Sequence, residues 1–535
     1  MNLPGNCFTR EVRLVLSVMT ALCIVSTAAC AQNDAVTRPR IVITADPELD
    51  DNNSLIRFLL YSTDLQIEGL IYASSGFHWK GDGKGTKWFV PGREYNRFGQ
   101  DKCPCESWRW AKDERFIHDI VEAYGKVYPN LKVHHQGYPT PEELKSKIRY
   151  GNIEFDGDIS KDSPGSDLIR SLILDDKPGR LYITAWGGQS TIARALKSIQ
   201  DQYEYTAEWE LIRTKVIRKV VLLPSGDQDD TYAKYIRPNW GSIEYRQFRE
   251  GPNYGYGAQL RAKPENAALL TPSWMKENIT SRGPLGSLYR VWGDGKQMVK
   301  DDIMDYFGLS GYTDDQLRKK GYVVWMPVQP KGAWLGEGDN HTFMNMLNNG
   351  LRAHEVGSYG GWGGHELAER SGESFAFNLS DTSQQAMANA LSSMAGRTNP
   401  GTFPDFFPAA QNDFAARLKW SVESKYKNAN HEPVVGIEGP LEVLAAPGET
   451  IRLNGSATDP DGDKVTVSWW QLKVGTYPGD VVITDSSTPQ CRITVPQDAG
   501  VGQTIHMIFQ ATDSGKPALT RYQRVIVIVK PQGRR

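Results

Sequence analysis

The sequence predicts an α/β protein whose larger part holds a doubly wound, mostly parallel sheet, followed by a small all-β sandwich. Two observations lead to this prediction. From Arg40 to Ala395, β-branched segments alternate with segments of helical spacing, which is the pattern of parallel strands joined by crossover helices. Beyond Pro433 the helical spacing ends, and short alternating segments separated by turn residues continue to the C-terminus, which is the pattern of an antiparallel sandwich.

The length and the charge of the chain limit its possible functions. Its 535 residues favour two or three domains. With 61 Lys and Arg against 63 Asp and Glu, the formal net charge is −2, so no overall positive field would attract nucleic acid or an anionic membrane. The chain also carries 15 Trp and 23 Tyr, residues that stack on sugar rings but equally fill protein cores.

The first 31 residues predict export. Arg10 and Arg13 precede an apolar run at 14–25 and small residues at 26–31, the order found in a secretory signal. Cleavage after Ala31 is one expectation. Residues 27–30 also resemble a lipoprotein box, so a lipid anchor on Cys30 is the alternative. We therefore expect a periplasmic protein, an outer-membrane lipoprotein or a secreted protein, with membrane contact only through that anchor.

The first elements expected in the mature chain form a βαβ unit. Arg40–Ala45 is β-branched and predicts a buried strand, Asn52–Tyr61 has apolar residues at helical spacing, and Gln66–Tyr72 returns to strand composition. The alternation then continues. Helices are expected at 116–124, 141–148, 167–174, 190–199 and 382–395, and strands at 181–185, 216–223 and 322–326. Two stretches without this pattern, 76–110 and 239–295, predict long insertions that serve as binding loops or lids.

The composition changes near 428–433, which predicts a boundary between a domain at 38–428 and one at 432–532. The later segment resembles the Ig-like modules appended to many secreted glycan-degrading enzymes. Asp459, Asp461 and Asp463 alternate in one of its turns. They either bind Ca²⁺ or form a solvated Asp-Gly turn.

Four acidic residues stand between the first predicted strand and the first predicted helix. Asp46, Glu48, Asp50 and Asp51 lie within six residues of one another, and their charges repel unless a cation or the helix dipole compensates them. Ca²⁺ is the natural partner because it takes several oxygen ligands. The alternative is a helix N-cap, although capping requires only one Asp.

The spacing Asp46-Pro47-x-x-Asp50-Asp51 resembles the D-P-G-x-D-D signature of nucleoside hydrolases, whose family chemistry is Ca²⁺-dependent cleavage of an N-ribosidic bond. The resemblance implies a nucleoside-hydrolase-like sheet, with Asp46 and Asp51 as metal ligands. It also implies that Asp50 is the base that deprotonates a metal-bound water.

Two later segments extend this resemblance. Residues 185–193 match the family's G-P-L-T-N-I-A turn, which implies that Ser190 supplies a backbone carbonyl to the metal. Residues 412–416 resemble the family's H-D-P-x-A step into a helix, which implies that Asp413 is the remaining carboxylate ligand and places Asn412 beside the substrate.

The chain also departs from the nucleoside hydrolase pattern. Glu48 replaces the usual Gly, Thr44 replaces an acidic residue, and Asn412 replaces a His that helps the base to leave. The Asn expected to contact ribose is missing from residues 73–76. The resemblance therefore implies a retained metal core without nucleoside recognition.

Features along the whole chain resemble a narrower bacterial family, described as cellulose-binding proteins with a nucleoside-hydrolase-like domain. These features are the Asp50-Asp51 pair with SLIRFLLYS after it, Glu337-Gly338-Asp339, the Gly-rich stretch 360–364, QNDFAARLKW and the Ig-like tail.

Further side chains are expected at the same cleft. Asp227 contacts a sugar hydroxyl or caps a loop, and Glu337 and Asp339 contact substrate or replace Asp413 at the metal. Trp362 is a sugar platform or a core residue. His78, His341 and His365 lie in or beside the predicted site loops and are candidate proton donors.

Three functions follow from the sequence. The first is calcium-dependent hydrolysis of glycosidic bonds in plant or algal glycans, with water attacking directly and the anomeric configuration inverted. The second is non-catalytic binding of a polysaccharide such as cellulose. The third, N-ribosyl (nucleoside) hydrolysis, is the least favoured because of the departures above. In each of the first two the partner is a polysaccharide or oligosaccharide.

Overall fold

The computed structural model describes residues 38–96, 101–366 and 403–532, and its α/β part and C-terminal sandwich belong to one compact unit. The expected signal segment, the possible lipid anchor on Cys30 and the helix expected at 382–395 lie outside the described residues. Among the residues described, no helix has the length and the apolar character needed to cross a bilayer.

A six-stranded parallel sheet forms the centre of the α/β part. Its order is β3-β2-β1-β4-β5-β6, with β1 Arg40–Ala45, β2 Gln66–Tyr72, β3 Ile148–Tyr150, β4 Leu181–Ala185, β5 Val220–Pro224 and β6 Glu244–Tyr245. The chain winds outward from β1 in one direction and then returns to β4 on the other side. The doubly wound prediction is confirmed, and ligands in such sheets bind at this reversal, beyond the carboxyl ends of the strands.

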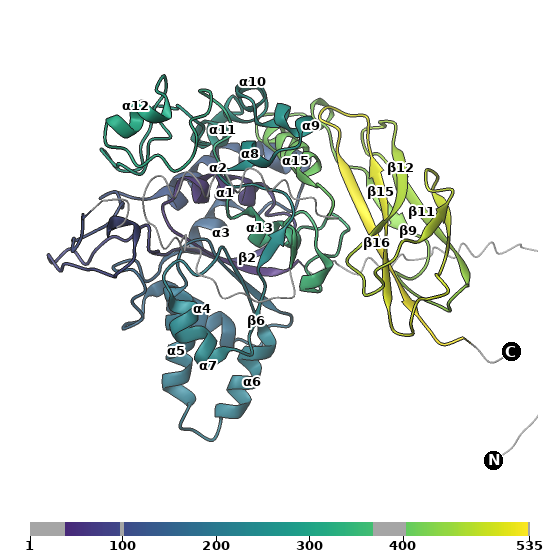
Figure 1. Cartoon of the computed structure of the whole chain (residues 1–535), viewed down its shortest axis with the longest axis horizontal. Coiled ribbons are helices and arrows are strands. Elements are labelled where there is room, and N and C mark those ends of the chain that lie inside the picture. Colours follow the sequence, from purple (N-terminus) through teal and green to yellow (C-terminus); the bar gives the residue numbers. More distant parts are fainter. Residues whose placement is uncertain (1–37, 97–100, 367–402, 533–535) are drawn as a thin grey trace, which may run out of the picture. The chain divides into compact units, whose positions relative to one another are not determined.

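Helices cover both faces of this sheet (Figure 1). One face packs against α1 Leu49–Leu60, α2 Phe116–His134 and α15 Phe407–Trp420, and the other against α4 Pro164–Leu174, α5 Ser190–Tyr203 and α6 Trp209–Lys219. Strand β1 is buried along its whole length, with Ile41 and Ile43 in the first core and Val42 in the second. Burial on both faces explains why β1 is a continuous β-branched run.

The stretches without a periodic pattern fold into packed loops and short helices. Short elements of the α/β part, inside and outside these stretches, include α7 Arg237–Trp240, α8 Ala258–Arg261, α9 Pro264–Ala267, α10 Pro272–Met275, α11 Gly283–Leu288, α12 Asp314–Lys319, α13 Asn340–Phe343 and the two-stranded pair β7 Phe248–Glu250 and β8 His365–Glu366. The short α3 Pro141–Ser146 corresponds to the helix expected at 141–148. Part of this region has its own apolar core around Trp292 and Phe307. The insertions therefore add a further layer of structure over the carboxyl edge of the sheet.

The C-terminal part is the expected sandwich of two four-stranded sheets. Their orders are β10-β16-β15-β12 and β13-β14-β11-β9, from β9 Val434–Ile437, β10 Glu442–Ala445, β11 Thr450–Thr458, β12 Thr466–Leu472, β13 Val482–Thr484, β14 Gln490–Thr494, β15 Thr504–Thr512 and β16 Thr520–Val529. All eight strands fall inside the predicted range 432–532, whose limits remain a prediction. Trp469 and Phe509 lie in the core between the sheets.

Two strand predictions were wrong. Val216–Leu223 was expected to be a strand, but its first four residues complete α6 and the strand begins at Val220. Tyr322–Met326 forms no strand, and Val323, Val324 and Met326 are instead buried under the insertions. A short apolar run has no periodicity that separates a strand from a buried loop or a helix end, so tertiary packing decided both segments.

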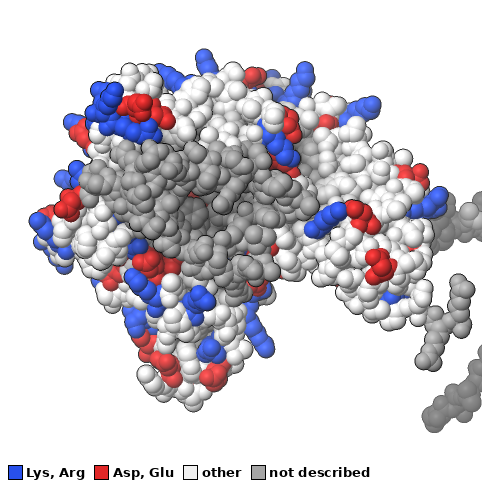
Figure 2. Space-filling view, viewed as in Figure 1, with Lys and Arg blue, Asp and Glu red and all other residues white. Residues whose placement is uncertain are grey.

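Charges of both signs are interspersed over the described part of the face that Figure 2 shows. This distribution matches the near balance of acidic and basic residues in the sequence. No single-sign patch dominates that face.

Candidate metal centre at the carboxyl edge of the sheet

Five carboxylates meet where β1 ends, and we call them the acidic cluster: Asp46, Glu48, Asp50, Asp51 and Asp339. Asp46 follows β1 directly, Glu48 is the N-cap of α1, and Asp50 and Asp51 lie in the first turn of that helix. Asp339 arrives from far along the chain as the N-cap of α13. The positive end of the α1 dipole points at these charges but offsets only part of their repulsion.

Short contacts hold the acidic cluster together. The Asp46 amide donates to Asp51 Oδ1 at 3.0 Å, and Ser225 Oγ donates to Asp339 Oδ1 at 2.5 Å. Asp46, Asp51 and Asp339 are each at most 3% exposed. The cluster is therefore a buried assembly and not a solvated turn.

Asp50 is oriented from both sides. The Gly338 amide donates to its Oδ2 at 3.1 Å, and the Tyr256 hydroxyl lies 3.1 Å from its Oδ1 and 3.3 Å from Glu48 Oε1. A Cβ at position 338 would lie 2.2 Å from Asp50 Oδ2, so only glycine allows the backbone to approach this closely. Tyr256 belongs to an insertion whose sequence gave no sign of this role.

Asp46 is the least satisfied member of the cluster. It is fully buried, and neither carboxylate oxygen has a hydrogen-bond partner among the described residues. The turn after β4 closes over it, since a Cβ at Gly187 would lie 2.9 Å from Asp46 Cγ. A buried ionised group without partners is costly, whereas a hard divalent cation would satisfy these oxygens. The donor set therefore fits the calcium ion that the sequence predicts.

Burial and mutual repulsion raise the pKa of every carboxyl group in the cluster. Burial, with repulsion from Asp50, raises the pKa of Asp46 to about 7, and burial raises the pKa of Asp50 to about 6. The pKa values of Glu48, Asp51 and Asp339 are also well above the ordinary range, first through burial and then through the neighbouring carboxylates. These carboxylates cannot all be ionised near neutral pH without a counter-ion.

The three candidate histidines are placed differently. His78 is fully buried beside Asp46 and Glu48, and burial together with the charge of Arg109 holds its pKa well below the ordinary value. It is therefore neutral, which argues against a proton-donor role. His341 Nδ1 lies 2.7 Å from the Gly338 carbonyl oxygen, next to the cluster, whereas His365 Nε2 lies 3.0 Å from the Ser358 carbonyl oxygen.

The prediction of Asp413 as a metal ligand is corrected. Asp413 lies within α15, where Arg417 donates to its Oδ1 at 3.0 Å and Arg521 of the sandwich donates to its Oδ2 at 2.6 Å. Its charge is already compensated by two guanidinium groups. Asp339, the alternative that the sequence offered, takes the place in the acidic cluster because it caps a helix that begins at the edge of the sheet.

The structure places four predicted substrate contacts among structural partners, and for Asp227 and Trp362 these are the loop cap and the core position that the sequence offered as alternatives. Glu337 is fully buried in an ion pair with Arg57 at 2.5 Å, and Asp227 accepts from the Tyr232 and Ala233 amides, so it caps a loop. Trp362 is 1% exposed and packs in the core, with Arg521 over its ring. Asn412 Nδ2 donates to the Ala518 carbonyl oxygen of the sandwich. In each case a structural partner occupies the side chain.

Ser190 begins α5 directly after the turn that closes over Asp46. Its amide donates to Asp229 Oδ2 at 2.9 Å. The contribution of its carbonyl oxygen to a metal stays a prediction.

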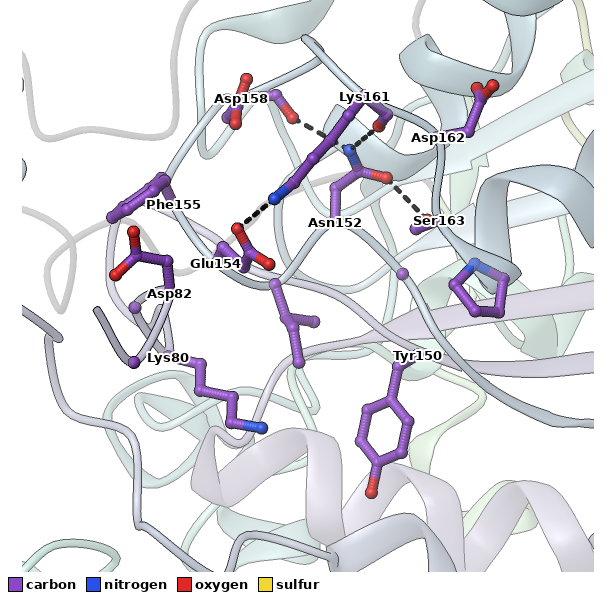
Figure 3. Close-up of a pocket in the computed structure, with 15 residues that line it drawn as sticks. Lys80, Asp82, Tyr150, Asn152, Glu154, Phe155, Asp158, Lys161, Asp162 and Ser163 are labelled. Carbon is purple, nitrogen blue, oxygen red and sulfur yellow. Dashed lines mark hydrogen bonds and ion pairs between the residues drawn. The ribbon is translucent and has the colours of Figure 1, made fainter. Parts of the chain in front are cut away.

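A cavity of about 410 Å³ opens beyond β3 (Figure 3). Lys80, Asp82, Tyr150, Glu154 and Lys161 are among the residues that line it. Its rim continues the edge that carries the acidic cluster, because the Gly151 amide donates to the Tyr72 carbonyl oxygen and Ser74 Oγ donates to the Asn152 carbonyl oxygen. Strand β3 is separated from β1 only by β2, which corresponds to roughly 10 Å.

A solved structure from Saccharophagus degradans resembles this chain over most of its length. It is described as a nucleoside hydrolase-related hypothetical protein associated with carbohydrate metabolism. The two share 26% identity with a TM-score of 0.65, and the match covers 92% of this chain and 100% of the other.

Other matches are weaker. A PKD domain from the KIAA 1837 protein matches at 22% identity, covering 18% of this chain and 83% of its own, with a TM-score of 0.13. The effector protein XOO4466 matches at 10% identity, covering 58% of this chain and 81% of its own, with a TM-score of 0.28. Among curated proteins, nothing matches.

Family comparison identifies both parts of the chain. Residues 450–529 match the family described as cellulose-binding protein Sde0182, C-terminal domain. Residues 40–365, which are more than half of the chain, match the nucleoside-hydrolase-like domain of the corresponding family. The chain therefore belongs to the family described as cellulose-binding Sde182, nucleoside hydrolase-like domain.

Proposed function

We propose that this protein is an exported, calcium-dependent hydrolase of glycosidic bonds in plant or algal glycans. The observation that carries the proposal is the buried acidic cluster, in which Asp46 has no hydrogen-bond partner among the described residues. The family's description as cellulose-binding and the carbohydrate-associated relative support a glycan as the partner. Export is supported by the sequence of residues 1–31.

Asp46, Asp51, Asp339 and the carbonyl oxygen of Ser190 are the groups proposed to hold calcium. When bound, calcium would neutralise the carboxylates and attract sugar hydroxyl groups. Ser225 fixes Asp339 for this task and the turn at Gly187 shields Asp46 from water. The ligands are thus preorganised by neighbours on β4, β5 and their loops.

Asp50 is the proposed general base. Gly338 and Tyr256 fix its two oxygens, and its pKa of about 6 lets it accept a proton near neutral pH. In this role Asp50 takes a proton from water as the water attacks the anomeric carbon, while the glycosidic C–O bond breaks and the leaving oxygen takes up a proton from solvent. Direct attack by water inverts the anomeric configuration.

The alternative function is polysaccharide binding without catalysis, and the cavity beyond β3 favours it. Tyr150 lines this cavity, stacks on Tyr72 with ring centroids 4.7 Å apart, and is 41% exposed. An exposed aromatic ring, in a cavity that Lys80 and Asp82 also line, provides both a stacking surface and hydrogen-bonding groups for a sugar chain. In this alternative the acidic cluster is a structural metal site.

One experiment separates the two functions. The mature protein is incubated with a panel of polysaccharides and with inosine, with and without a calcium chelator, and released sugar is measured alongside pull-down on cellulose. The hydrolase proposal expects chelator-sensitive sugar release that Asp50→Asn abolishes while pull-down persists. Asp119→Asn, an exposed carboxylate on α2 paired with Arg115, is the matched control.

Pull-down without any release of sugar would favour the binding alternative. In that case Tyr150→Ala is expected to weaken pull-down while Asp50→Asn leaves it unchanged. Release of ribose from inosine would instead support nucleoside hydrolysis.

A further inference from the structure

His78 lies beside the acidic cluster and has one ring nitrogen without a hydrogen-bond partner among the described residues. Its Nδ1 lies 2.8 Å from the carbonyl oxygen of Arg109. A carbonyl oxygen only accepts, so Nδ1 carries the proton and Nε2 keeps its lone pair. Nε2 is buried and has no hydrogen-bond partner among the described residues. A histidine whose Nδ1–H is held by a backbone carbonyl, with Nε2 free, has the arrangement that orients metal-binding histidines.

Two carboxylates lie close to the His78 ring. One ligand atom from each of Asp46, Glu48 and His78 lies within 4.8 Å of the other two. Both oxygens of the fully buried Asp46 lack hydrogen-bond partners in the described part of the chain. Unpartnered buried atoms of two residues, Asp46 and His78, therefore lie close to a carboxylate oxygen of Glu48. In chemical terms this group is a metal site and not an accumulation of surface charge.

The group of His78, Asp46 and Glu48 differs from the neighbouring group of Glu48, Asp50 and Asp51, which offers only oxygen ligands. Glu48 is also within 4.8 Å of Asp50 and Asp51, so it stands between two sets of donors. Carboxylates shared between neighbouring ions are a feature of two-metal sites. Glu48 occupies the position at which the nucleoside hydrolase signature has glycine, so this chain adds a ligand where that signature has none.

A nearby positive charge does not prevent metal binding. Arg109 approaches His78 through its backbone, but its guanidinium group is paired with Glu94 at 2.9 Å and with Asp302 at 2.7 Å. Those two carboxylates are its direct partners, and its charge also lowers the pKa values of Asp46 and Glu48. Asp46 and Glu48 remain as the negative charges that a divalent ion would balance.

We propose that His78, Asp46 and Glu48 bind a divalent transition-metal ion of the Zn²⁺, Co²⁺ or Mn²⁺ class, beside the calcium position and sharing its carboxylates. Imidazole nitrogen suits these ions, whereas calcium prefers oxygen ligands. The proposal concerns metal binding alone. It stands whether or not the protein hydrolyses glycans.

The test is a cobalt titration of the full mature chain. Metal-free protein saturated with Ca²⁺ is titrated with Co²⁺ and followed by visible absorption and calorimetry. We expect one Co²⁺ per chain in addition to calcium. His78→Gln is expected to weaken Co²⁺ binding by at least about tenfold while Ca²⁺ affinity is unchanged. His118→Gln, a histidine whose Nδ1 instead contacts the Tyr72 hydroxyl, is the control that retains Co²⁺ binding.

A second variant keeps the test decisive if His78→Gln fails to fold. Glu48→Gly restores the residue of the nucleoside hydrolase signature and is expected to lose the cobalt position, with circular dichroism confirming the fold. The proposal is overturned if Ca²⁺-saturated protein takes up no Co²⁺, or if folded His78→Gln or Glu48→Gly binds Co²⁺ as the wild type does. A separate calcium titration shows whether the protein binds Ca²⁺, so failure of the proposed calcium site is distinguished from failure of the proposed cobalt site.

Discussion

Two groups of buried carboxylates in this molecule differ in how their charge is compensated. At the junction of α15 with the sandwich, Asp413 is met by Arg417 and Arg521, and Glu432 lies 2.9 Å from the second of these. At the carboxyl edge of the sheet, Asp46 is equally buried but meets other carboxylates and has no partner for its own oxygens in the described residues. The first group is complete within the chain, whereas the second carries charge that the proposed calcium ion would balance. The comparison teaches that buried acids indicate a ligand only where protein cations are missing.

The largest effect is expected at the junction. Asp413→Ala leaves two buried guanidinium groups without their main partner and should lower the free energy of unfolding by about 3–5 kcal/mol. Chemical denaturation measures this loss, which should be the same with and without calcium. Asp119→Ala, at an exposed ion pair, should change stability by less than about 0.5 kcal/mol. A loss of calcium binding in Asp413→Ala would contradict the separation of the two groups.

Calcium is expected to give the next largest effect. At a concentration about 100 times its Kd, calcium should stabilise the wild type by about 2.7 kcal/mol. Asp46→Asn should remove most of this gain, because it removes a proposed ligand whose oxygens have no hydrogen-bond partner in the described chain. Thermal unfolding with calcium and with chelator measures the difference. An equal calcium response in Asp46→Asn would contradict the assignment of this cluster as the calcium site.

The pH dependence of the metal-free protein sharpens the comparison further. The pKa of Asp46 is raised to about 7 and that of Asp50 to about 6, above the ordinary value of 3.8. The folded state therefore binds protons more tightly than the unfolded state, and stability should fall as pH rises from about 4 to about 7. The loss should be smaller than the sum of the two separate shifts, because neighbouring carboxyl groups share protons. Calcium should flatten this profile, and a stability that rises with pH over this range is the contrary result.

The smallest effect on stability is expected from the hydrogen bond between Tyr256 and Asp50 in the acidic cluster. Tyr256→Phe removes a hydroxyl that lies 3.1 Å from Asp50 Oδ1, which should change stability by about 0.5–1.5 kcal/mol. The same contact lowers the pKa of Asp50, so the acidic limb of any pH–activity profile should move to higher pH in the variant. An unchanged profile would show that Tyr256 does not orient the base.

Much of the fold could be predicted because local patterns were strong. The limits of β1, β2 and β4 were predicted residue for residue, since each is a short β-branched run between turn residues. The late strand at Tyr322–Met326 failed because its apolar residues fill a core between insertions and pair with no sheet. An apolar segment can be predicted to be buried, but its composition does not say whether it pairs with a sheet or packs against loops.

The candidate site was predictable only where its residues are close in sequence. Asp46, Asp50 and Asp51 come from one strand end and the helix that follows, so their meeting required no tertiary information. The distant carboxylate was assigned to Asp413 through a resemblance in a later segment, and Asp339, the alternative, is the residue that reaches the cluster. Tyr256 and the ligand geometry of His78 gave no local signal, because an insertion and a single ring orientation position them.

The sequence by itself determined that an acidic strand–helix junction would stand at the edge of a parallel sheet, since strand, turn and helix are all set by neighbouring residues. Only the tertiary structure decided which distant groups complete it. Whether a buried Asp meets an arginine or another carboxylate depends on how loops separated by hundreds of residues pack together. That choice made Asp413 part of the domain junction and Asp339 part of the candidate metal centre.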